Sequence, residues 1–275
     1  MTMDSAEISA LKNKRKITML TAYDYPMAEL LDKAGIDMIL VGDSLANVVL
    51  GLDSTTKVGM AEMLHHAKAV SRAVKNALVV GDMPYESYQL HPDECVKNAR
   101  RFIDEAGCRA VKLEWFDACP DVTGRIVEAG IPVMGHIGLT PQTVDKIGGF
   151  KVRGKDAETA RQLIKQAAKL EEKGCFAIVL ECVPDKISQL ISEKIRIPAI
   201  GIGAGVHCDG QVLVINDVVG LFNRYTPKFV KKYADLSPLI LKAAQEFKQE
   251  VLQGVFPSEK YSFSIKEEEF RKLLQ

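Results

Sequence analysis

The stretch MILVGDS at residues 38–44 decides the fold of this chain. Four apolar residues, typical of a strand buried on both faces, run directly into a glycine, an acid and a hydroxyl. A similar change follows four later apolar runs, in LVVGDMP (78–84), AVKLE (110–114), PVMGHIG (132–138) and AIVLE (177–181). If these runs are consecutive parallel strands, their polar ends lie side by side, which is the layout of an active site.

Strand-like and helix-like segments alternate along the chain on both sides of these runs. The predicted strands are residues 17–22, 38–41, 78–81, 110–113, 132–134, 177–180, 199–202 and 212–215. The predicted helices are roughly residues 26–34, 60–73, 92–106, 118–129, 156–173 and 184–195. Glycine follows four of these helices where a helix commonly stops, at positions 35, 107, 130 and 174.

Such alternation predicts a parallel sheet covered by helices, and right-handed crossovers allow either a closed barrel or an open doubly wound sheet. Two observations favour the barrel. Seven or eight units fit the 275 residues, and polar residues finish nearly every strand instead of clustering at one switch point. We therefore predict an α/β fold, a (β/α)8 TIM barrel.

The length predicts one domain over residues 1–275, with residues 236–275 as a C-terminal helix and tail. Two longer segments, 45–59 and 138–155, follow the second and fifth strands on the side where barrel loops build sites. The first is predicted to be a covering loop. The second contains GGFKVRG, which indicates tight turns near a ligand.

Composition excludes several classes of partner. Lysine plus arginine and aspartate plus glutamate number 36 each, so no charge excess indicates nucleic acid or an anionic membrane surface. The six cysteines form no C-x-x-C pair, as expected for reduced thiols in the cytoplasm. The apolar run after the basic N-terminus, residues 17–20, is too short for a signal peptide or a membrane span. A small-molecule partner is expected.

Three acids end the second, third and fourth predicted strands: Asp43, Asp82 and Glu114. Two such charges 4 Å apart repel by roughly 4 kcal/mol at an effective dielectric constant of about 20. The cluster must therefore take up protons, pair with a cation or bind a metal. Oxygen ligands alone favour a hard ion, magnesium above zinc.

Three further residues complete the predicted site. Lys112 lies two residues before Glu114, hence on the same face of its strand, where it can neutralise part of the cluster and hold a substrate carboxylate. His136 can donate a hydrogen bond to an oxyanion, and Glu181 is placed to act as a base across the substrate. This arrangement suits removal of a proton next to a carbonyl, with the enolate held by a metal.

Simpler interpretations apply to single residues. One acid at a strand end is usually a helix cap, but five polar ends in consecutive strands, with Lys112 in register, are hard to explain as caps. GIGAG at 201–205 is better explained by close packing than by phosphate binding. Cys182 should point away from Glu181, so no thiol nucleophile is expected, and no G-x-S-x-G elbow supports a serine nucleophile.

Longer strings around these residues resemble one known family. They are TAYDYPMA, LVGDSLANVVLGLDST, VVGDMPYESY, AVKLE, VMGHIGLTPQ, GGFKVRG, VLECVP, IPAIGIGAGVHCDGQVLV and PKFVKKY, in that order between about residues 16 and 263. The chain resembles the ketopantoate hydroxymethyltransferase family. The resemblance implies a barrel of the phosphoenolpyruvate mutase/isocitrate lyase group, bound Mg2+, and a homodecamer.

The resemblance also implies the reaction, in which 3-methyl-2-oxobutanoate, 5,10-methylenetetrahydrofolate and water give 2-dehydropantoate and tetrahydrofolate. It implies that Asp43 and Asp82 bind the metal and the substrate, with Glu114 as the third acidic partner of the metal. It further implies substrate contacts and a proton acceptor, namely Ser44, Lys112 and His136 on the keto acid and Glu181 as the base. The folate is expected near the loops after strands five to seven.

Two rivals remain. The first is another magnesium enolate enzyme of the same barrel group, such as a carbon–carbon lyase, although the K-K-C-G-H string of isocitrate-lyase-type enzymes is absent from the sequence. The second is a non-catalytic barrel that binds a keto acid as a sensor. A sensor is expected to lack at least one acid, base or metal position, and all of them are present here.

Overall fold

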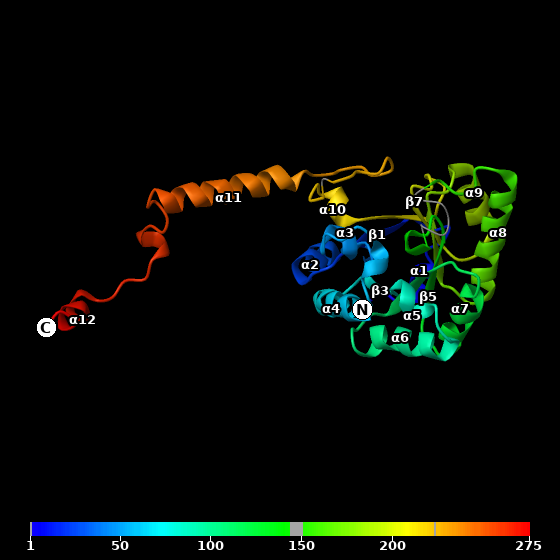
Figure 1. The fold of residues 1–275 in the computed structure, drawn as a ribbon, viewed down its shortest axis with the longest axis horizontal. Coiled ribbons are helices and arrows are strands. Elements are labelled where there is room, and N and C mark those ends of the chain that lie inside the picture. Colours follow the sequence, from blue (N-terminus) through cyan, green and yellow to red (C-terminus); the bar gives the residue numbers. More distant parts are fainter. Residues whose placement is uncertain (1, 144–150, 223) are drawn as a thin grey trace.

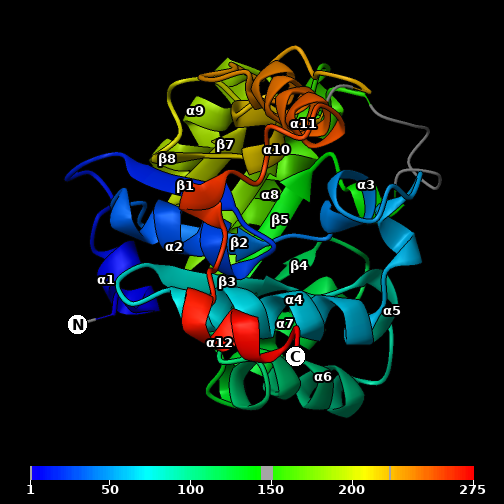
Figure 2. The same cartoon turned by 90° about the vertical axis from the view of Figure 1, so that its left-hand side faces the viewer.

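A computed structural model describes residues 2–143, 151–222 and 224–275 of the chain. Eight parallel strands pair in sequence order and close into a barrel, with the last strand hydrogen-bonded to the first. The strands are β1 (Ile17–Thr21), β2 (Met38–Val41), β3 (Leu78–Asp82), β4 (Ala110–Glu114), β5 (Val133–Gly138), β6 (Ala177–Glu181), β7 (Ala199–Ile202) and β8 (Gly210–Leu213). Figure 2 shows these strands at the centre of the molecule with helices outside them. The predicted (β/α)8 barrel is confirmed.

Alternate residues of each strand fill the inside of the barrel, because side chains on a strand point to opposite faces in turn. A buried apolar cluster holds these inward side chains, among them Met19, Met38, Val80 and Met134. Ile8 from the short N-terminal helix belongs to the same cluster and is fully buried. This helix, α1 (Ser5–Ser9), therefore packs against the barrel interior.

Helices pack around the barrel and bury a second apolar cluster against the outer faces of the strands. The main helices after the first six strands, one for each connection, are α2 (Tyr25–Lys33), α4 (Met60–Ala73), α6 (Pro92–Asp104), α7 (Cys119–Glu128), α8 (Ala157–Glu172) and α9 (Asp185–Lys194). A loop alone joins β7 to β8. All six were predicted, within two residues at each end. The glycines predicted as stops have positive φ, as a left-handed helix end requires.

The eighth strand is Gly210–Leu213, two residues earlier than the predicted 212–215. Gly210 pairs with Ile17 at the start of β1. Only glycine allows this close approach, because a Cβ atom at position 210 would lie 2.5 Å from the Ile17 carbonyl oxygen. Residues from Ile215 instead form the one-turn helix α10 (Ile215–Val218). The short helices α3 (Leu45–Val48) and α5 (Tyr85–Tyr88) were also missed, because one turn is too short for a helical period to show.

The covering loop predicted after the second strand contains α3 and the 3-10 turn η1 (Thr55–Lys57). The segment after β5 contains the 3-10 turn η2 (Pro141–Thr143), and the first three residues of its GGFKVRG string, 148–150, lie outside the described residues.

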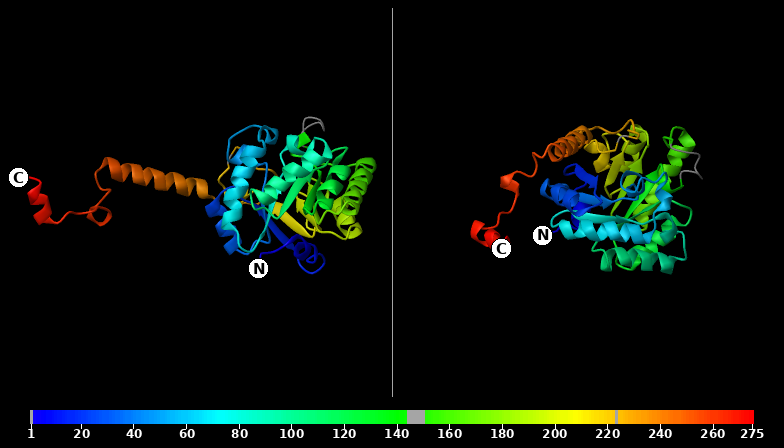
Figure 3. Two further views of the ribbon diagram at one scale, coloured as in Figure 1. Left: turned by 90° about the horizontal axis from the view of Figure 1, so that it is seen from below. Right: turned by 60° about the vertical axis from the view of Figure 1, so that its left-hand side comes forward.

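A long helix, α11 (Leu236–Leu252), extends away from the barrel, and the 3-10 turn η3 (Glu259–Tyr261) and helix α12 (Glu267–Lys272) lie beyond it (Figures 1 and 3). This agrees with the C-terminal helix and tail predicted over residues 236–275. No residue of α11 is buried, and Leu239, Ile240 and Phe247 are each more than half exposed. Among the described residues, no helix has the length and apolar character to cross a membrane.

Candidate active site

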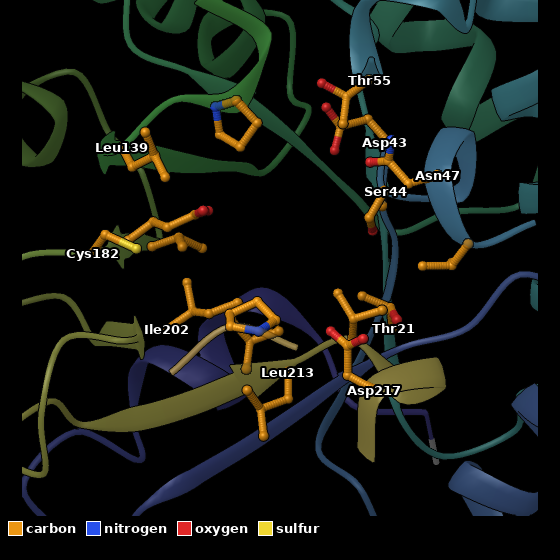
Figure 4. A pocket seen from close by; sticks show the side chains of 18 of the residues that line it. Thr21, Asp43, Ser44, Asn47, Thr55, Leu139, Cys182, Ile202, Leu213 and Asp217 are labelled. Atoms are coloured by element: carbon orange, nitrogen blue, oxygen red, sulfur yellow. The ribbon is translucent and has the colours of Figure 1, made fainter. Parts of the chain in front are cut away.

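The polar strand ends open into one cavity of about 820 Å3 at the carboxyl end of the barrel. Asp43 lies just past β2, and Asp82, Glu114 and Glu181 are the last residues of β3, β4 and β6. Ser44, Lys112 and His136 line the same cavity. In Figure 4 the labelled side chains of Asp43 and Ser44 enter it from one side and those of Leu139 and Cys182 from the other. The structure thus brings together all seven residues predicted for the site.

Strand register explains why the charges meet. Asp82 on β3 is paired with Lys112 on β4, so the two side chains point into the barrel at the same level. The Lys112 ammonium lies 2.8 Å from Asp82 Oδ1, and both side chains are buried. The same register pairs Glu114 with His136 on β5. The inward orientation of Lys112, predicted from its spacing to Glu114, is confirmed.

The acidic cluster is buried, and this controls its protonation. Burial raises the pKa of Asp82 to about 7; the Lys112 ammonium opposes the rise and the Asp43 carboxylate adds to it. Burial also raises the pKa of Glu114 well above its usual value, with Asp43 and Asp82 acting in the same direction. One lysine therefore does not neutralise three carboxylates, and the cluster favours an additional proton or cation.

His136 lies among charged groups and is itself neutral. Its Nδ1 is 3.3 Å from Lys112 Nζ and 3.5 Å from Glu114 Oε1, and its Nε2 is 3.3 Å from Glu181 Oε2. Burial lowers the pKa of His136 well below its usual value, and the Lys112 charge lowers it further. A neutral imidazole can donate one hydrogen bond to a developing oxyanion without bringing a charge of its own.

Glu181 has the character of a base. Its side chain is 15% exposed, at the cavity. Burial raises the pKa of Glu181 to about 8, which the Lys112 charge opposes. A carboxylate with a raised pKa binds a proton more strongly, as general-base catalysis near neutral pH requires. Its backbone carbonyl accepts a hydrogen bond from Leu139 N at 2.8 Å, which fixes the end of β6 against the end of β5.

Ser44 is held by a residue that was not predicted. Its hydroxyl lies 2.8 Å from the hydroxyl of Tyr23, a buried residue two positions after the end of β1. Burial raises the pKa of Tyr23 above its usual value, so the phenol keeps its proton.

Gln142 is the main member of the site that sequence reasoning missed. Its side-chain amide donates to Asp43 Oδ2 at 3.0 Å, and its backbone N–H donates to Glu114 Oε2 at 3.0 Å. The Tyr88 hydroxyl donates to Gln142 Oε1. Gln142 therefore links two of the predicted metal ligands. The available signal was its place at the end of VMGHIGLTPQ, in the loop after a site-bearing strand.

Cys182 lines the cavity, contrary to the expectation that it points away from Glu181. The alternation of side chains fails here because the Cys182 backbone turns to a φ of 50° after the end of β6. Burial raises the pKa of its thiol to about 12, so it is not a thiolate nucleophile.

Close packing explains the GIGAG string. A side chain at Gly203 would lie 2.7 Å from the Phe229 ring, and one at Gly205 would lie 2.5 Å from Asp185.

The donor chemistry of the cluster fits a hard cation. Asp43, Asp82 and Glu114 supply carboxylate oxygens only, which suit magnesium. In the described part of the chain, no group of three or more histidine, cysteine, aspartate or glutamate side chains is already arranged around a common metal position. In the structure Lys112 neutralises Asp82, and Gln142 occupies one oxygen of Asp43. The assignment of metal ligands stays a prediction.

The fold and the site define a class: a (β/α)8 barrel enzyme with an acidic cluster at the strand ends. Among solved structures, phosphonopyruvate hydrolase in complex with oxalate and Mg2+ matches with a TM-score of 0.60 at 13% identity, over 98% of each chain. The 2,3-dimethylmalate lyase, a PEP mutase/isocitrate lyase superfamily member, matches with a TM-score of 0.60 at 14% identity, over 100% of this chain and 95% of the other. At these identities the likeness concerns the fold alone.

Sequence relatives identify the family. The model of the ketopantoate hydroxymethyltransferase family matches residues 2–259. The 3-methyl-2-oxobutanoate hydroxymethyltransferase of Syntrophomonas wolfei is 56% identical over 98% of this chain and 100% of its own length. The enzyme of that name from Carboxydothermus hydrogenoformans is 54% identical over 96% and 97%. The chain belongs to the ketopantoate hydroxymethyltransferase family.

Proposed function

We propose that this enzyme transfers a hydroxymethyl group from 5,10-methylenetetrahydrofolate to 3-methyl-2-oxobutanoate, giving 2-dehydropantoate and tetrahydrofolate for pantothenate biosynthesis. The observation that carries the proposal is the meeting of an acidic cluster, a buried lysine and a carboxylate of raised pKa in one cavity. These are the groups that proton removal next to a keto group requires. Membership of the family supports 3-methyl-2-oxobutanoate as the acceptor of a hydroxymethyl group, and the folate donor is part of the proposal.

Substrate binding follows from the charges. The Lys112 ammonium is buried beside Asp82 and supplies a positive charge for the substrate carboxylate. The Ser44 hydroxyl, oriented by Tyr23, can donate to the same carboxylate. Glu181 lines the same cavity and can meet the carbon chain of a keto acid held in this way.

Proton transfer is assigned to Glu181. In its ionised form the carboxylate takes the C3 proton, the electron pair of the C–H bond forms a C2–C3 double bond, and the π pair of the carbonyl moves to the keto oxygen to give an enolate. Neutral His136, next to Glu181, can donate a hydrogen bond to the oxygen that becomes negative. The C3 carbon then forms a bond to the methylene carbon of the folate, and the two bonds from that carbon to the folate nitrogens break. Water supplies the hydroxyl that completes the product, and the proton from C3 together with one from water goes to the two nitrogens to give tetrahydrofolate.

Mg2+ is the proposed metal, held by Asp43 and Asp82 with Glu114 as a further acidic partner. When bound, it would supply positive charge to the keto oxygen and so lower the cost of forming the enolate. Gln142 would fix the orientation of Asp43 and Glu114 through its hydrogen bonds.

The test of the reaction incubates the full-length protein with Mg2+, 3-methyl-2-oxobutanoate and 5,10-methylenetetrahydrofolate and follows 2-dehydropantoate by mass spectrometry. We expect product that depends on the enzyme and on the metal. Absence of product above a metal-free control would refute the proposal. The magnesium enolate lyase rival predicts cleavage of a methyl-branched hydroxy acid instead.

The role of Glu181 has a separate test that needs no folate. Exchange of the C3 hydrogen for deuterium should fall by about 100- to 10,000-fold in Glu181→Gln, the usual contribution of a general base. Glu193→Gln, an exposed carboxylate on α9, is the matched control and should exchange at the wild-type rate. Equal exchange in Glu181→Gln and wild type would show that another group is the base.

Assembly and location belong to the same proposal. A homodecamer is proposed, and the exposed apolar residues of α11 support association between copies. A cytoplasmic location is proposed in keeping with six free cysteines.

A further inference from the structure

One buried carboxylate in the cavity has no task in the proposed reaction. Asp217 lies in α10, the single turn that follows β8, and is only 8% exposed. Figure 4 shows its side chain directed into the cavity beside Thr21, apart from Asp43. Burial raises the pKa of Asp217, and the positive charge of Lys232 acts in the opposite direction. A buried carboxylate in a cavity normally requires a partner.

That partner is missing from the described part of the protein, where no hydrogen bond or ion pair reaches the Asp217 carboxylate. The other aspartates buried in the barrel are paired. Asp37 accepts hydrogen bonds from Arg15 and Thr18, and Asp209 from Lys12, Ser192 and Ala199. Within the described residues, the Asp217 carboxylate oxygens therefore accept no hydrogen bond, and the side chain faces the cavity (Figure 4).

The surrounding structure holds Asp217 in place. Ile215 N at the start of α10 donates to Thr21 Oγ at 3.0 Å, which joins the helix to the end of β1. The Val218 carbonyl accepts from Tyr233 N at 2.8 Å, and the Val219 carbonyl accepts from Leu236 N at 2.9 Å. These hydrogen bonds anchor both ends of α10, and a side chain on so short a helix needs such anchoring to keep a fixed position.

The cavity near Asp217 suits a flat ring. Ile202 and Leu213 lie on the same side of the cavity as Asp217 (Figure 4), and the apolar side chains Val214, Phe222 and Phe229 line the same cavity. Phe229 packs on Gly203, where a side chain would lie 2.7 Å from the ring. At about 820 Å3, the whole cavity is in the range of about 300–1,000 Å3 that holds a drug-sized ligand. A five-carbon keto acid is far smaller and leaves this region free.

We propose that Asp217 binds the pterin ring of the folate by accepting two hydrogen bonds, from the ring N3–H and the 2-amino group, while the apolar walls cover the faces of the ring. The two donors are adjacent and parallel, so they match the two oxygens of one carboxylate. The site rests on the proposed function, because it assumes a folate co-substrate. It lies on α10 after β8, outside the loops after strands five to seven where the folate was expected.

The mouth of the cavity is consistent with the rest of a folate. Lys151, Arg224 and Lys228 line the cavity and are exposed. An anionic glutamate tail that leaves the cavity would pass these cations, while the methylene group next to the pterin faces inward to the keto acid.

The decisive experiment measures tetrahydrofolate binding to the full-length protein by calorimetry, with Mg2+ and keto acid present. In Asp217→Asn an amide N–H2 replaces an acceptor oxygen, so we expect tetrahydrofolate to bind about 10- to 100-fold more weakly. The matched control is Asp53→Asn, which removes the same charge from an exposed residue that lines the same cavity and pairs with Lys57. The control should bind as wild type does.

A ligand-side measurement keeps the proposal testable if Asp217→Asn does not fold. A tetrahydrofolate analogue that carries hydrogen in place of the 2-amino group should bind wild type about 10-fold or more weakly than tetrahydrofolate itself. In Asp217→Asn the preference for the 2-amino group should disappear.

The outcomes separate this site from the proposed function. Suppose that wild type binds tetrahydrofolate, that Asp217→Asn binds it with the same affinity, and that wild type binds the analogue with the same affinity too. The pterin site is then wrong and the proposed function stands. If wild type does not bind tetrahydrofolate at all, both are wrong. If Asp217→Asn weakens the binding of the keto acid as much as the binding of tetrahydrofolate, Asp217 affects the cavity as a whole and the pterin assignment is overturned.

Discussion

Replacement of Gly138 by alanine is the sharpest test of how the base is positioned. Gly138 is the last residue of β5 and has a φ of 100°. A Cβ atom there would lie 2.3 Å from the Glu181 carbonyl oxygen and 2.7 Å from Val183 Cγ2. The neighbouring Leu139 N–H donates to that same carbonyl at 2.8 Å. Alanine must therefore push the end of β6 away from β5.

Two effects add up in Gly138→Ala. Backbone strain at a positive φ costs about 1–3 kcal/mol for a residue with a side chain. Forced overpacking in a rigid interior costs about a further 1–3 kcal/mol. We expect the free energy of unfolding to fall by about 2–6 kcal/mol. A shift of about 1 Å in Glu181 should also slow C3 hydrogen exchange by about 100-fold, because proton transfer depends on geometry.

Gly130→Ala is the matched control. Gly130 has a similar positive φ of 79°, but no atom lies within 4 Å of the Cβ that alanine would add. Only the cost of the backbone strain remains, about 1–3 kcal/mol. Urea unfolding of both variants measures the difference, and deuterium exchange at C3 of the keto acid measures the effect on the site. Exchange in the folded control should equal wild type.

The reasoning fails if Gly138→Ala is no less stable than Gly130→Ala within about 0.5 kcal/mol, the usual error of such comparisons. It also fails if Gly138→Ala is destabilised but exchanges C3 hydrogen at the wild-type rate, since the clash would then leave Glu181 in place.

Three further predictions concern the metal cluster, the base and the frame of the barrel. Gln142→Ala should weaken Mg2+ binding by about 10- to 100-fold, measured by calorimetry, because Asp43 and Glu114 lose a shared support; unchanged affinity would contradict that role. C3 exchange should rise with pH and level off above about 8, because Glu181 is active only when ionised and burial raises its pKa to that value; a rate independent of pH between 6 and 9, which spans about three units around this pKa, would exclude Glu181 as the titrating base. Asp32→Asn should destabilise the fold by about 1–3 kcal/mol, because the carboxylate accepts backbone N–H bonds from Lys75, Asn76 and Ala77. Burial raises the pKa of Asp32, but these hydrogen bonds outweigh it and lower the pKa below its usual value. The difference in unfolding midpoint between wild type and Asp32→Asn should therefore be present above about pH 4 and shrink as the pH falls below that value.

Strand ends and helix stops could be predicted because they depend on neighbours in the chain. The run AVKLE illustrates this: its apolar residues indicate a strand, and the period of two places Lys112 and Glu114 on one face. The six helices between strands carry a helical period long enough to detect. Gly210 could not be recognised as the start of β8, because its pairing depends on the approach of Ile17 from the other end of the sequence.

The local sequence by itself determined the barrel, the order of its strands and the identity of the acids, lysine and histidine at their ends. Only the tertiary structure decided which of these groups touch and which proton each one holds. Gln142 reaches Asp43 across 99 residues of chain, and no local pattern records such a contact. The raised pKa values of Asp82 and Glu181 likewise arise from burial by the whole ring of strands. Ring closure is a collective property, because each strand end is desolvated by strands and loops that lie far from it in sequence.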